Sequence, residues 1–190
     1  MSVRDHPDKK QNYGDKIIMK TKALSTVKAA ITGALYAAFT YLSAVMGLAF
    51  GPVQFRFSEA LTILPIYTPS AVAGLFVGCV VSNIVSTVSP LDMIFGSLAT
   101  LLAAVMTRVL RNAAVKGFPL LSFLSPVIIN GIVIGAEISL LGGAEDVSFT
   151  LFLTNALSVA AGEAAVLATL GVLLRLAIEK TPELKRVLGE

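Results

Sequence analysis

Long apolar runs separated by short polar connections constrain the fold of this chain more than any other feature. These runs are long enough to cross the roughly 30 Å hydrocarbon core of a bilayer. Only 14% of the residues are charged, against about 25% in a soluble domain. No alternating strand pattern with polar turns is visible, which disfavours a β-barrel. The sequence therefore predicts a single-domain, all-α polytopic membrane protein.

Turn and charge signals divide the predicted membrane domain, residues 23–178, into six helices. The expected spans are about 23–49, 58–67, 70–88, 91–110, 119–141 and 149–178. Residues 1–22 and 179–190 are polar and are predicted to be cytoplasmic tails. The first of these lacks the short apolar region and cleavage site of a secretory signal. Met1 and Met19 both remain candidate start residues.

The second predicted helix is unusually short. As an α-helix, its ten residues rise ~15 Å, about half of a bilayer core. It therefore either begins deep in the outer half of the membrane or is supported by a buried preceding loop. The last span is unusually long. Its 30 residues rise ~45 Å as an α-helix, so the helix must tilt or protrude from the membrane.

Basic residues define the expected orientation. With six spans, both termini lie on the same side of the membrane. If that side is the cytoplasm, every one of the 15 Lys and Arg residues except Arg56 falls in a cytoplasmic segment. This asymmetry matches the positive-inside rule. We therefore expect a cell-membrane protein with the N- and C-termini inside.

Polar side chains interrupt the apolar pattern mostly in the predicted outer half of the bundle. The stretch Phe50–Leu64 holds three of them between two spans, where charge next to lipid is costly and indicates a site. Asn155 and Glu163, eight residues apart, share one helix face within ~80°. The candidate ligand-binding residues are Gln54, Arg56, Glu59, Asn83, Asp92, Asn130, Asn155 and Glu163. They predict a pocket that is open to the outside and closed to the inside.

The chemistry of these residues favours a small polar ligand that is rich in N–H donors. A carboxylate can accept two N–H bonds at once, as from the amidine edge of a purine-like ring. A cationic amine would suit a second acid. For Asp92, capping of its own helix N-terminus is an equally good explanation.

Other functional classes find little support in the sequence. The only histidine, His6, lies in the N-terminal tail, and Cys79 is the only cysteine, so no metal site is expected. No phosphate-binding G-x-x-x-x-G-K-[ST] loop, HExxH or serine-elbow motif is present. We expect no cofactor, no nucleic-acid partner and no catalysis by this chain. An intramembrane enzyme that uses Asp92 and Glu163 as a catalytic pair stays as a weaker alternative.

Small residues recur every four positions in the first span. Ala30, Ala34 and Ala38 lie on one helix face, where a partner backbone can approach closely. The face either packs within the protein's own bundle or docks to another membrane subunit. Because the chain has an outside pocket and no ATP-binding loop, we expect a binding subunit that depends on a separate motor.

Four segments in order resemble the QueT family of substrate-binding S-components of energy-coupling factor (ECF) transporters. They are FGPVQFRFSEALTILP, GLFVGCVVSNI, LDMIFGSLATLLAA and NALSVAAGEA, within a similarity that covers roughly residues 24–178. The resemblance implies a six-helix S-component-like bundle that captures a queuosine precursor from outside. The ligand would be a 7-deazaguanine such as preQ0 or preQ1, or queuine.

The resemblance also implies partners and a gate. A transmembrane coupling subunit would dock on Ala30, Ala34 and Ala38, and two ATPase subunits would supply energy. The loop between the first two spans, here Phe50–Ser58, would gate the pocket. An S-component for a different vitamin-like solute remains the main alternative, with the same fold and another ligand.

Overall fold

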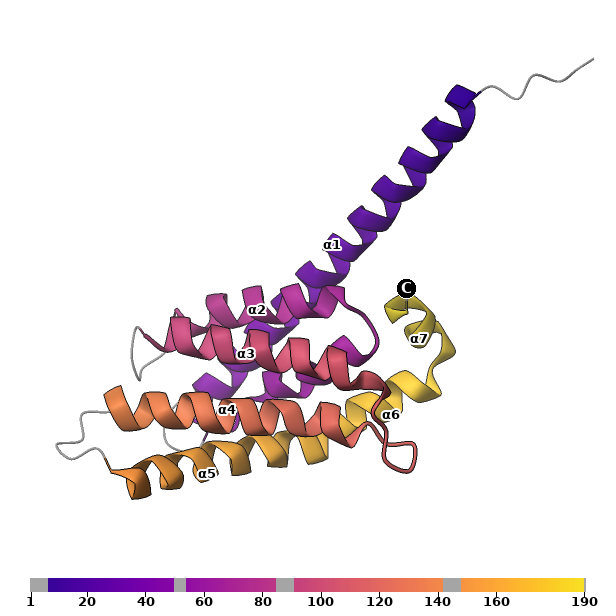
Figure 1. Cartoon of the computed structure of the whole chain (residues 1–190). Coiled ribbons are helices and arrows are strands. Elements are labelled where there is room, and N and C mark those ends of the chain that lie inside the picture. Colours follow the sequence, from indigo (N-terminus) through magenta and orange to yellow (C-terminus); the bar gives the residue numbers. More distant parts are fainter. Residues whose placement is uncertain (1–6, 50–53, 85–90, 142–147, 190) are drawn as a thin grey trace, which may run out of the picture.

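The computed structural model describes residues 7–49, 54–84, 91–141 and 148–189, without the side chains of residues 7–15, 17 and 92. Its regular elements in these ranges are helices (Figure 1). In chain order they are α1 (Pro7–Val45), η1 (Phe57–Ile66), α2 (Ser70–Asn83), α3 (Asp92–Val109), η2 (Leu110–Asn112), α4 (Leu120–Leu141), α5 (Phe149–Val166), η3 (Leu167–Gly171), α6 (Val172–Lys180) and α7 (Pro182–Leu188). The elements η1 and η2 are 3₁₀-helices, and η3 is a single π-helical turn that joins α5 to α6.

The bundle is organised around η1. Helices α1 to α5 pack as successive neighbours, each against the next, and η1 contacts α1, α3 and η3 (Figure 1). All residues from Ser58 to Pro65 are buried. The short second element is therefore an internal rod that the longer helices enclose.

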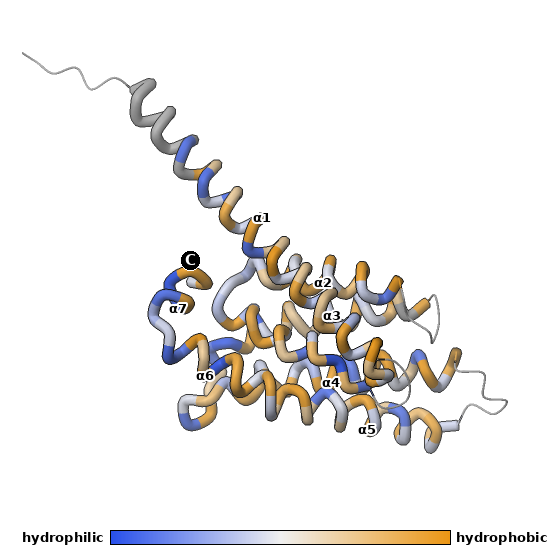
Figure 2. The backbone as a smooth tube through the Cα atoms, turned by 180° about the vertical axis from the view of Figure 1, so that it is seen from behind, coloured by the Kyte–Doolittle hydropathy of each residue, from blue (hydrophilic) through white to orange (hydrophobic). Residues whose placement is uncertain are grey.

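The outer surface of the bundle suits a lipid environment. Three helical segments are long and apolar enough to cross a membrane: Met93–Asn112, Leu120–Leu141 and Phe149–Lys180. Large apolar side chains such as Leu102, Ile132 and Leu157 are more than half exposed. Hydrophilic residues are frequent in the coloured part of α1 that lies outside the bundle and around α6 and α7 (Figure 2). The prediction of an all-α fold is confirmed, and at least these segments have the dimensions of membrane spans.

Both predicted tails contain helix, which the sequence analysis did not anticipate. Helix α1 begins at Pro7 and continues without a break to Val45, so its 39 residues extend ~58 Å. Its N-terminal part projects obliquely away from the bundle, and its later part packs against α2 and η1 (Figure 1). At the other terminus, α7 forms within the predicted C-terminal tail, with Pro182 in its first turn. Proline is well suited to this position because the first-turn amide has no intrahelical acceptor.

The geometry of η1 corrects the expectation of a short α-helix. As a 3₁₀-helix, its ten residues rise about 20 Å rather than ~15 Å. The preceding residues Gln54 and Arg56 are only 8% and 5% exposed. Of the two explanations for the short span, a buried preceding segment is therefore the one observed. Residues 50–53 of the expected gating loop lie outside the described residues.

Hydrogen bonds fix η1 at both ends. At its start, the Phe57 amide donates to Ser43 Oγ at 2.9 Å, and Thr40 Oγ1 donates to Ser58 Oγ at 2.7 Å. At its end, Arg108 Nη1 donates to the carbonyls of Pro65 at 3.1 Å and Ile66 at 3.4 Å. No amide inside the helix donates to these last carbonyls, so the arginine satisfies them. The rod is thus anchored to α1 on one side and to α3 on the other.

Helices α1 and α2 meet through glycines. A Cβ atom on Gly78 would lie 2.7 Å from the Gly33 carbonyl oxygen and 2.9 Å from Tyr36 Cβ. Such distances are closer than atoms tolerate, and the first obstacle is backbone. The small residues in the middle of α1 therefore include some that serve internal packing.

We expect Gly78→Ala to destabilise the protein by about 1–3 kcal/mol, because the added methyl group must push α1 and α2 apart. Thermal unfolding of the purified chain in detergent measures this. Val77→Ala is the control, since Val77 lies on the same helix and is 56% exposed. An unchanged melting temperature for Gly78→Ala would mean that the helices separate without cost.

Candidate ligand-binding cavity

A buried polar cavity lies between η1 and the helices α3, α4 and α5. Its lining residues are Gln54, Arg56, Glu59, Gly96, Thr100, Asn130, Ile134, Val159 and Glu163. Four separate segments of the chain therefore converge here, and most of the lining side chains carry a polar group. Three of the four charged side chains that are buried in the described part of the chain, Arg56, Glu59 and Glu163, line it, so the cavity is the chemically distinctive part of the fold.

Two carboxyl groups face this cavity. Glu59, on η1, accepts a hydrogen bond from the Tyr36 hydroxyl at 2.5 Å through Oε1. Glu163, on α5, lies within hydrogen-bonding reach of Asn130 on α4. Glu59 Oε2 and Glu163 Oε1 are buried and accept no hydrogen bond from a donor among the described residues, and the two carboxyl groups lie within hydrogen-bonding reach of each other. A buried acceptor without a partner costs free energy, so each of these oxygens is suited to a donor supplied by a ligand.

Arg56 is the cation of the site. Its Nε donates to the Ala49 carbonyl at 2.8 Å, and its Nη1 donates to Asn83 Oδ1 at 3.3 Å. The guanidinium also lies close enough to Glu59 and Glu163 for electrostatic attraction. Arg56 thus balances one of two nearby carboxylates, and the lining residues carry a net charge of −1 when both acids are ionised.

The cavity is contracted in this structure. Water-sized molecules find room over a volume of about 10 Å³, which corresponds to roughly one water molecule. A bicyclic ligand therefore requires an outward movement of at least one wall.

The structure brings together five of the eight predicted ligand-binding residues. Gln54, Arg56, Glu59, Asn130 and Glu163 line the cavity. Asn83 lies next to it, with its amide oxygen on Arg56 and its nitrogen donating to Cys79 Sγ at 3.4 Å. Ligand contact by these residues remains a prediction.

The other two predicted residues do not line the cavity. Asn155 is buried nearer the start of α5, where it donates to Ser139 Oγ on α4 at 2.9 Å. It therefore joins two helices. Asp92 begins α3, and its side chain lies outside the described part of the structure.

Sequence reasoning missed the polar side chains on α1 that support the cavity. Tyr36, Thr40 and Ser43 are fully buried and bind η1 or the residue at its start. Their spacing of four and three residues places them on one helix face. This hydroxyl-bearing face within an apolar span was the available signal. The apolar walls Ile134 and Val159 carry no such signal, because their residue types are common throughout the bundle.

We expect Tyr36→Phe to lower both stability and ligand affinity. It removes the donor to Glu59 Oε1 and leaves that buried oxygen without its partner, at a cost of about 1–3 kcal/mol. Thermal unfolding and equilibrium binding of the purified variant measure the two effects. Tyr41→Phe is the control, because the Tyr41 hydroxyl donates to the Val81 carbonyl at an exposed position. Equal losses in both variants would contradict a specific role for Tyr36.

The small-residue face of α1 separates into two parts. Ala30, Ala34 and Ala38 are exposed, whereas Gly33 is buried against α2. A groove of about 420 Å³ runs beside α2 and includes Ala30 and Ala34 among its walls. Internal packing therefore accounts for Gly33, and these three alanines remain available on the surface of the chain.

Comparisons with known proteins point to one family. The sequence profile described as "QueT transporter" matches residues 26–180. A curated relative from Lactococcus lactis subsp. cremoris (strain MG1363), "Queuosine precursor transporter QueT", is 34% identical over 82 residues. That alignment covers 43% of this chain and 48% of the relative, so it spans about half the relative's length. No solved structure gives a significant match.

Proposed function

Because this chain belongs to the QueT transporter family, we propose that it is the substrate-binding subunit of an ECF-type importer. Its cargo is a queuosine precursor, either a 7-deazaguanine such as preQ0 or preQ1, or queuine. The Lactococcus relative, a queuosine precursor transporter, supports the class of cargo. The buried pair Glu59 and Glu163 in the cavity is the observation that carries the proposal.

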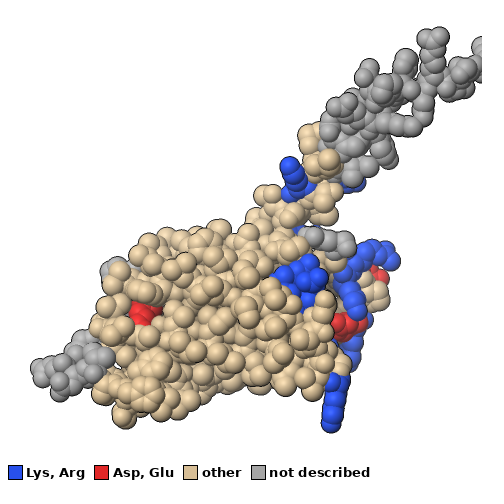
Figure 3. Space-filling model, in the orientation of Figure 1, with Lys and Arg blue, Asp and Glu red and all other residues tan. Residues whose placement is uncertain are grey.

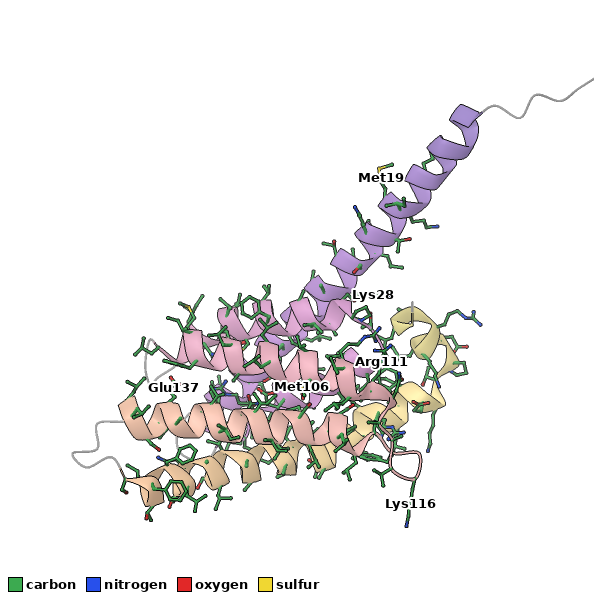
Figure 4. The ribbon with its side chains drawn as sticks, viewed as in Figure 1. Met19, Lys28, Met106, Arg111, Lys116 and Glu137 are labelled. Atoms are coloured by element: carbon green, nitrogen blue, oxygen red, sulfur yellow. The ribbon has the colours of Figure 1, made fainter. Side chains whose placement is uncertain are left out.

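The proposed topology has six crossings with both termini in the cytoplasm. They are α1, η1, α2, α3, α4 and the continuous rod from α5 to α6. Exposed basic residues gather at one end of the molecule, as Figure 3 shows for one face. Lys28, Arg111 and Lys116 lie at this end, and Glu137 lies toward the other (Figure 4). The positive-inside rule assigns the basic end to the cytoplasm.

The chemistry of the cavity fits a deazaguanine in a specific way. The guanine-like edge presents a ring N–H and an exocyclic amine side by side, which one carboxylate can bind with two hydrogen bonds. Asn130 adds a side chain with both donors and an acceptor. Because two carboxylates face one guanidinium, the site also favours a ligand with a positive charge, and an aminomethyl arm provides it.

Energy for uptake comes from other subunits in this proposal. A transmembrane coupling subunit docks on the α1 face that contains Ala30, Ala34 and Ala38, and two ATPase subunits drive it. Exposure of all three alanines supports this assignment, since small residues let a partner helix approach closely. The chain itself then acts in binding and not in catalysis.

Direct binding tests the proposed cargo. The purified chain is titrated with preQ1, preQ0, queuine and guanine, and affinities are measured by calorimetry. We expect at least one deazaguanine to bind more tightly than guanine. Mass spectrometry of small molecules that co-purify from cells grown in rich medium provides an independent assay. Tight binding of an unrelated solute with no affinity for deazaguanines would transfer the chain to the alternative, another vitamin-like cargo.

We expect Ala34→Leu to impair uptake by cells while ligand binding by the isolated subunit stays normal. The larger side chain protrudes from the face that the coupling subunit would approach, so assembly suffers and the cavity does not. Uptake of labelled ligand and co-purification with the coupling subunit measure the effect. Ala165→Leu is the control, at an exposed alanine on α5. If Ala34→Leu transports as well as the control, the α1 face is not the docking surface.

A further inference from the structure

A polar cleft opens where α1 leaves the bundle and the last residues of the chain approach it. The cleft has a volume of about 300 Å³, and its walls are Lys20, Thr21, Leu24, Ser25, Lys28 and Gly189. Two walls carry ammonium groups, two carry hydroxyls, and none of the lining residues is acidic. This combination attracts a phosphate-bearing group more than any neutral or cationic ligand.

The C-terminal helix holds one of the two lysines in position. Lys28 Nζ donates to the carbonyls of Leu188 at 3.4 Å and Gly189 at 3.3 Å. The helix itself is attached to α6 by the ion pair between Lys185 and Glu179, at 2.8 Å. Leu188 also packs against the core cluster that contains Tyr36 and Ile178. The lysine is therefore fixed at the rim of the cleft, with a third donor direction still available to a ligand.

An apolar face of α1 leads away from this cleft into the membrane region. Leu24, Val27, Ile31 and Leu35 are 53%, 52%, 56% and 42% exposed. Their spacing of three and four residues puts them on the same side of the helix as Lys20 and Lys28. Cationic groups at one end and a continuous apolar face beyond them match the two ends of a phospholipid.

Further along, the same side of α1 borders an apolar groove. Its walls are Phe39, Leu42, Phe57, Ala60, Leu61, Leu170 and Leu174. The groove has a volume of about 430 Å³, and hydrocarbon side chains form it almost entirely. Leu35 and Leu42 are seven residues apart, so the exposed apolar face runs directly into the groove.

We propose that this continuous surface binds one anionic phospholipid. Its phosphate lies in the cleft with Lys20 and Lys28, and an acyl chain lies along α1 and reaches the apolar groove. Because two ammonium groups face the headgroup and none of the described lining residues is acidic, a headgroup with net negative charge binds better than a zwitterionic one. In the proposed orientation this lipid belongs to the inner leaflet. Only that assignment rests on the proposed function.

Native mass spectrometry of the purified full chain tests the site. The protein, in a neutral detergent, is titrated with phosphatidylglycerol or phosphatidylcholine that carry the same acyl chains. We expect one phosphatidylglycerol to bind preferentially. A lysine near an anionic lipid surface contributes about fivefold in affinity, so Lys20→Gln with Lys28→Gln should weaken phosphatidylglycerol binding about 30-fold. Phosphatidylcholine binding should change little.

The matched control removes the same charge elsewhere at the same end of the molecule. Lys116→Gln with Lys180→Gln alters two exposed lysines outside the cleft and should leave phosphatidylglycerol binding near the wild-type value. Unchanged thermal unfolding of both double variants shows that they fold. Unchanged deazaguanine binding would separate this site from the cavity, and the lipid experiment does not depend on that ligand being correct.

Three results would overturn the proposal. The first is equal binding of the two lipids by the wild-type chain. The second is an equal loss of binding in the two double variants, which would indicate a diffuse charge effect. The third is equal affinity for a dihexanoyl and a long-chain phosphatidylglycerol, which would remove the acyl chain from the apolar groove.

Discussion

We expect replacement of Glu163 by glutamine to lower the affinity of the purified chain for the proposed deazaguanine ligand about ten- to one-hundredfold. The substitution keeps the shape of the side chain and replaces one carboxylate oxygen by an NH₂ group. A hydrogen bond to a charged group contributes about 1.5–3 kcal/mol, and 1.4 kcal/mol corresponds to a factor of ten. Calorimetric titration of the variant and the wild type gives the ratio directly.

Glu137 provides the matched control for this substitution. It is a buried glutamate, 4% exposed, on α4, and it does not line the cavity. Glu137→Gln should therefore bind the ligand with an affinity close to that of the wild type. If Glu163→Gln binds as tightly as Glu137→Gln does, the carboxylate of Glu163 is not a ligand contact. The carboxylate that contacts the charged group of the ligand would then be assigned to Glu59.

Replacing Gly162 by alanine should damage the cavity severely. A Cβ at this position would overlap with the backbone carbonyl of Gln54, the segment that forms one wall of the cavity. That segment must move, and its neighbours Arg56 and Glu59 move with it. We expect a loss of at least about 1–3 kcal/mol of stability together with a severe loss of ligand binding.

Gly171→Ala is the control for this second prediction. Gly171 belongs to the same continuous helical segment from α5 to α6. The nearest atom to a Cβ added there is the flexible end of the Leu167 side chain, at 3.1 Å. A small rotation of the leucine accommodates the methyl group. Thermal unfolding and calorimetric binding of the two variants separate the cases. Normal binding by Gly162→Ala would show that α5 does not need to touch the Gln54 backbone.

Periodicity and charge were sufficient to predict most of the helical architecture. The spans expected at about 91–110, 119–141 and 149–178 agree with the observed helices to within a few residues. The QueT resemblance is confirmed by the profile match over residues 26–180. Apolar runs of this length leave few folding options, because a buried or lipid-facing backbone must satisfy its own hydrogen bonds.

The 3₁₀ geometry of η1 and the helices in the two tails could not be read in the same way. Contacts with Arg108, Thr40 and Ser43, which are distant in sequence, hold η1 in its 3₁₀ form. The end of helix α7 is held by Lys28, which is 160 residues away from Leu188 in sequence. Local patterns contain no information about such partners.

The candidate site was predictable to the extent that charge in an apolar setting is rare. That rule identified Gln54, Arg56, Glu59, Asn130 and Glu163, which the structure brings together. It also selected Asn155, whose amide instead links two helices, because the rule cannot distinguish a ligand contact from a helix–helix hydrogen bond. The rule did not select Tyr36, because hydroxyl groups are common in membrane helices and do not stand out there as charges do.

The 3₁₀ winding of η1 gives this element an adjustable length. A residue that changes from 3₁₀ to α geometry shortens the helix by about 0.5 Å and rewinds it by about 20°. With the Pro65 end held by Arg108, such a change would draw in and turn the end that bears Glu59. Two residues would supply about 1 Å and about 40°. Such rewinding would have to break the hydrogen bonds that hold the start of η1 to Ser43 and Thr40 on α1, so the shape of the cavity and the contact between η1 and α1 would change together.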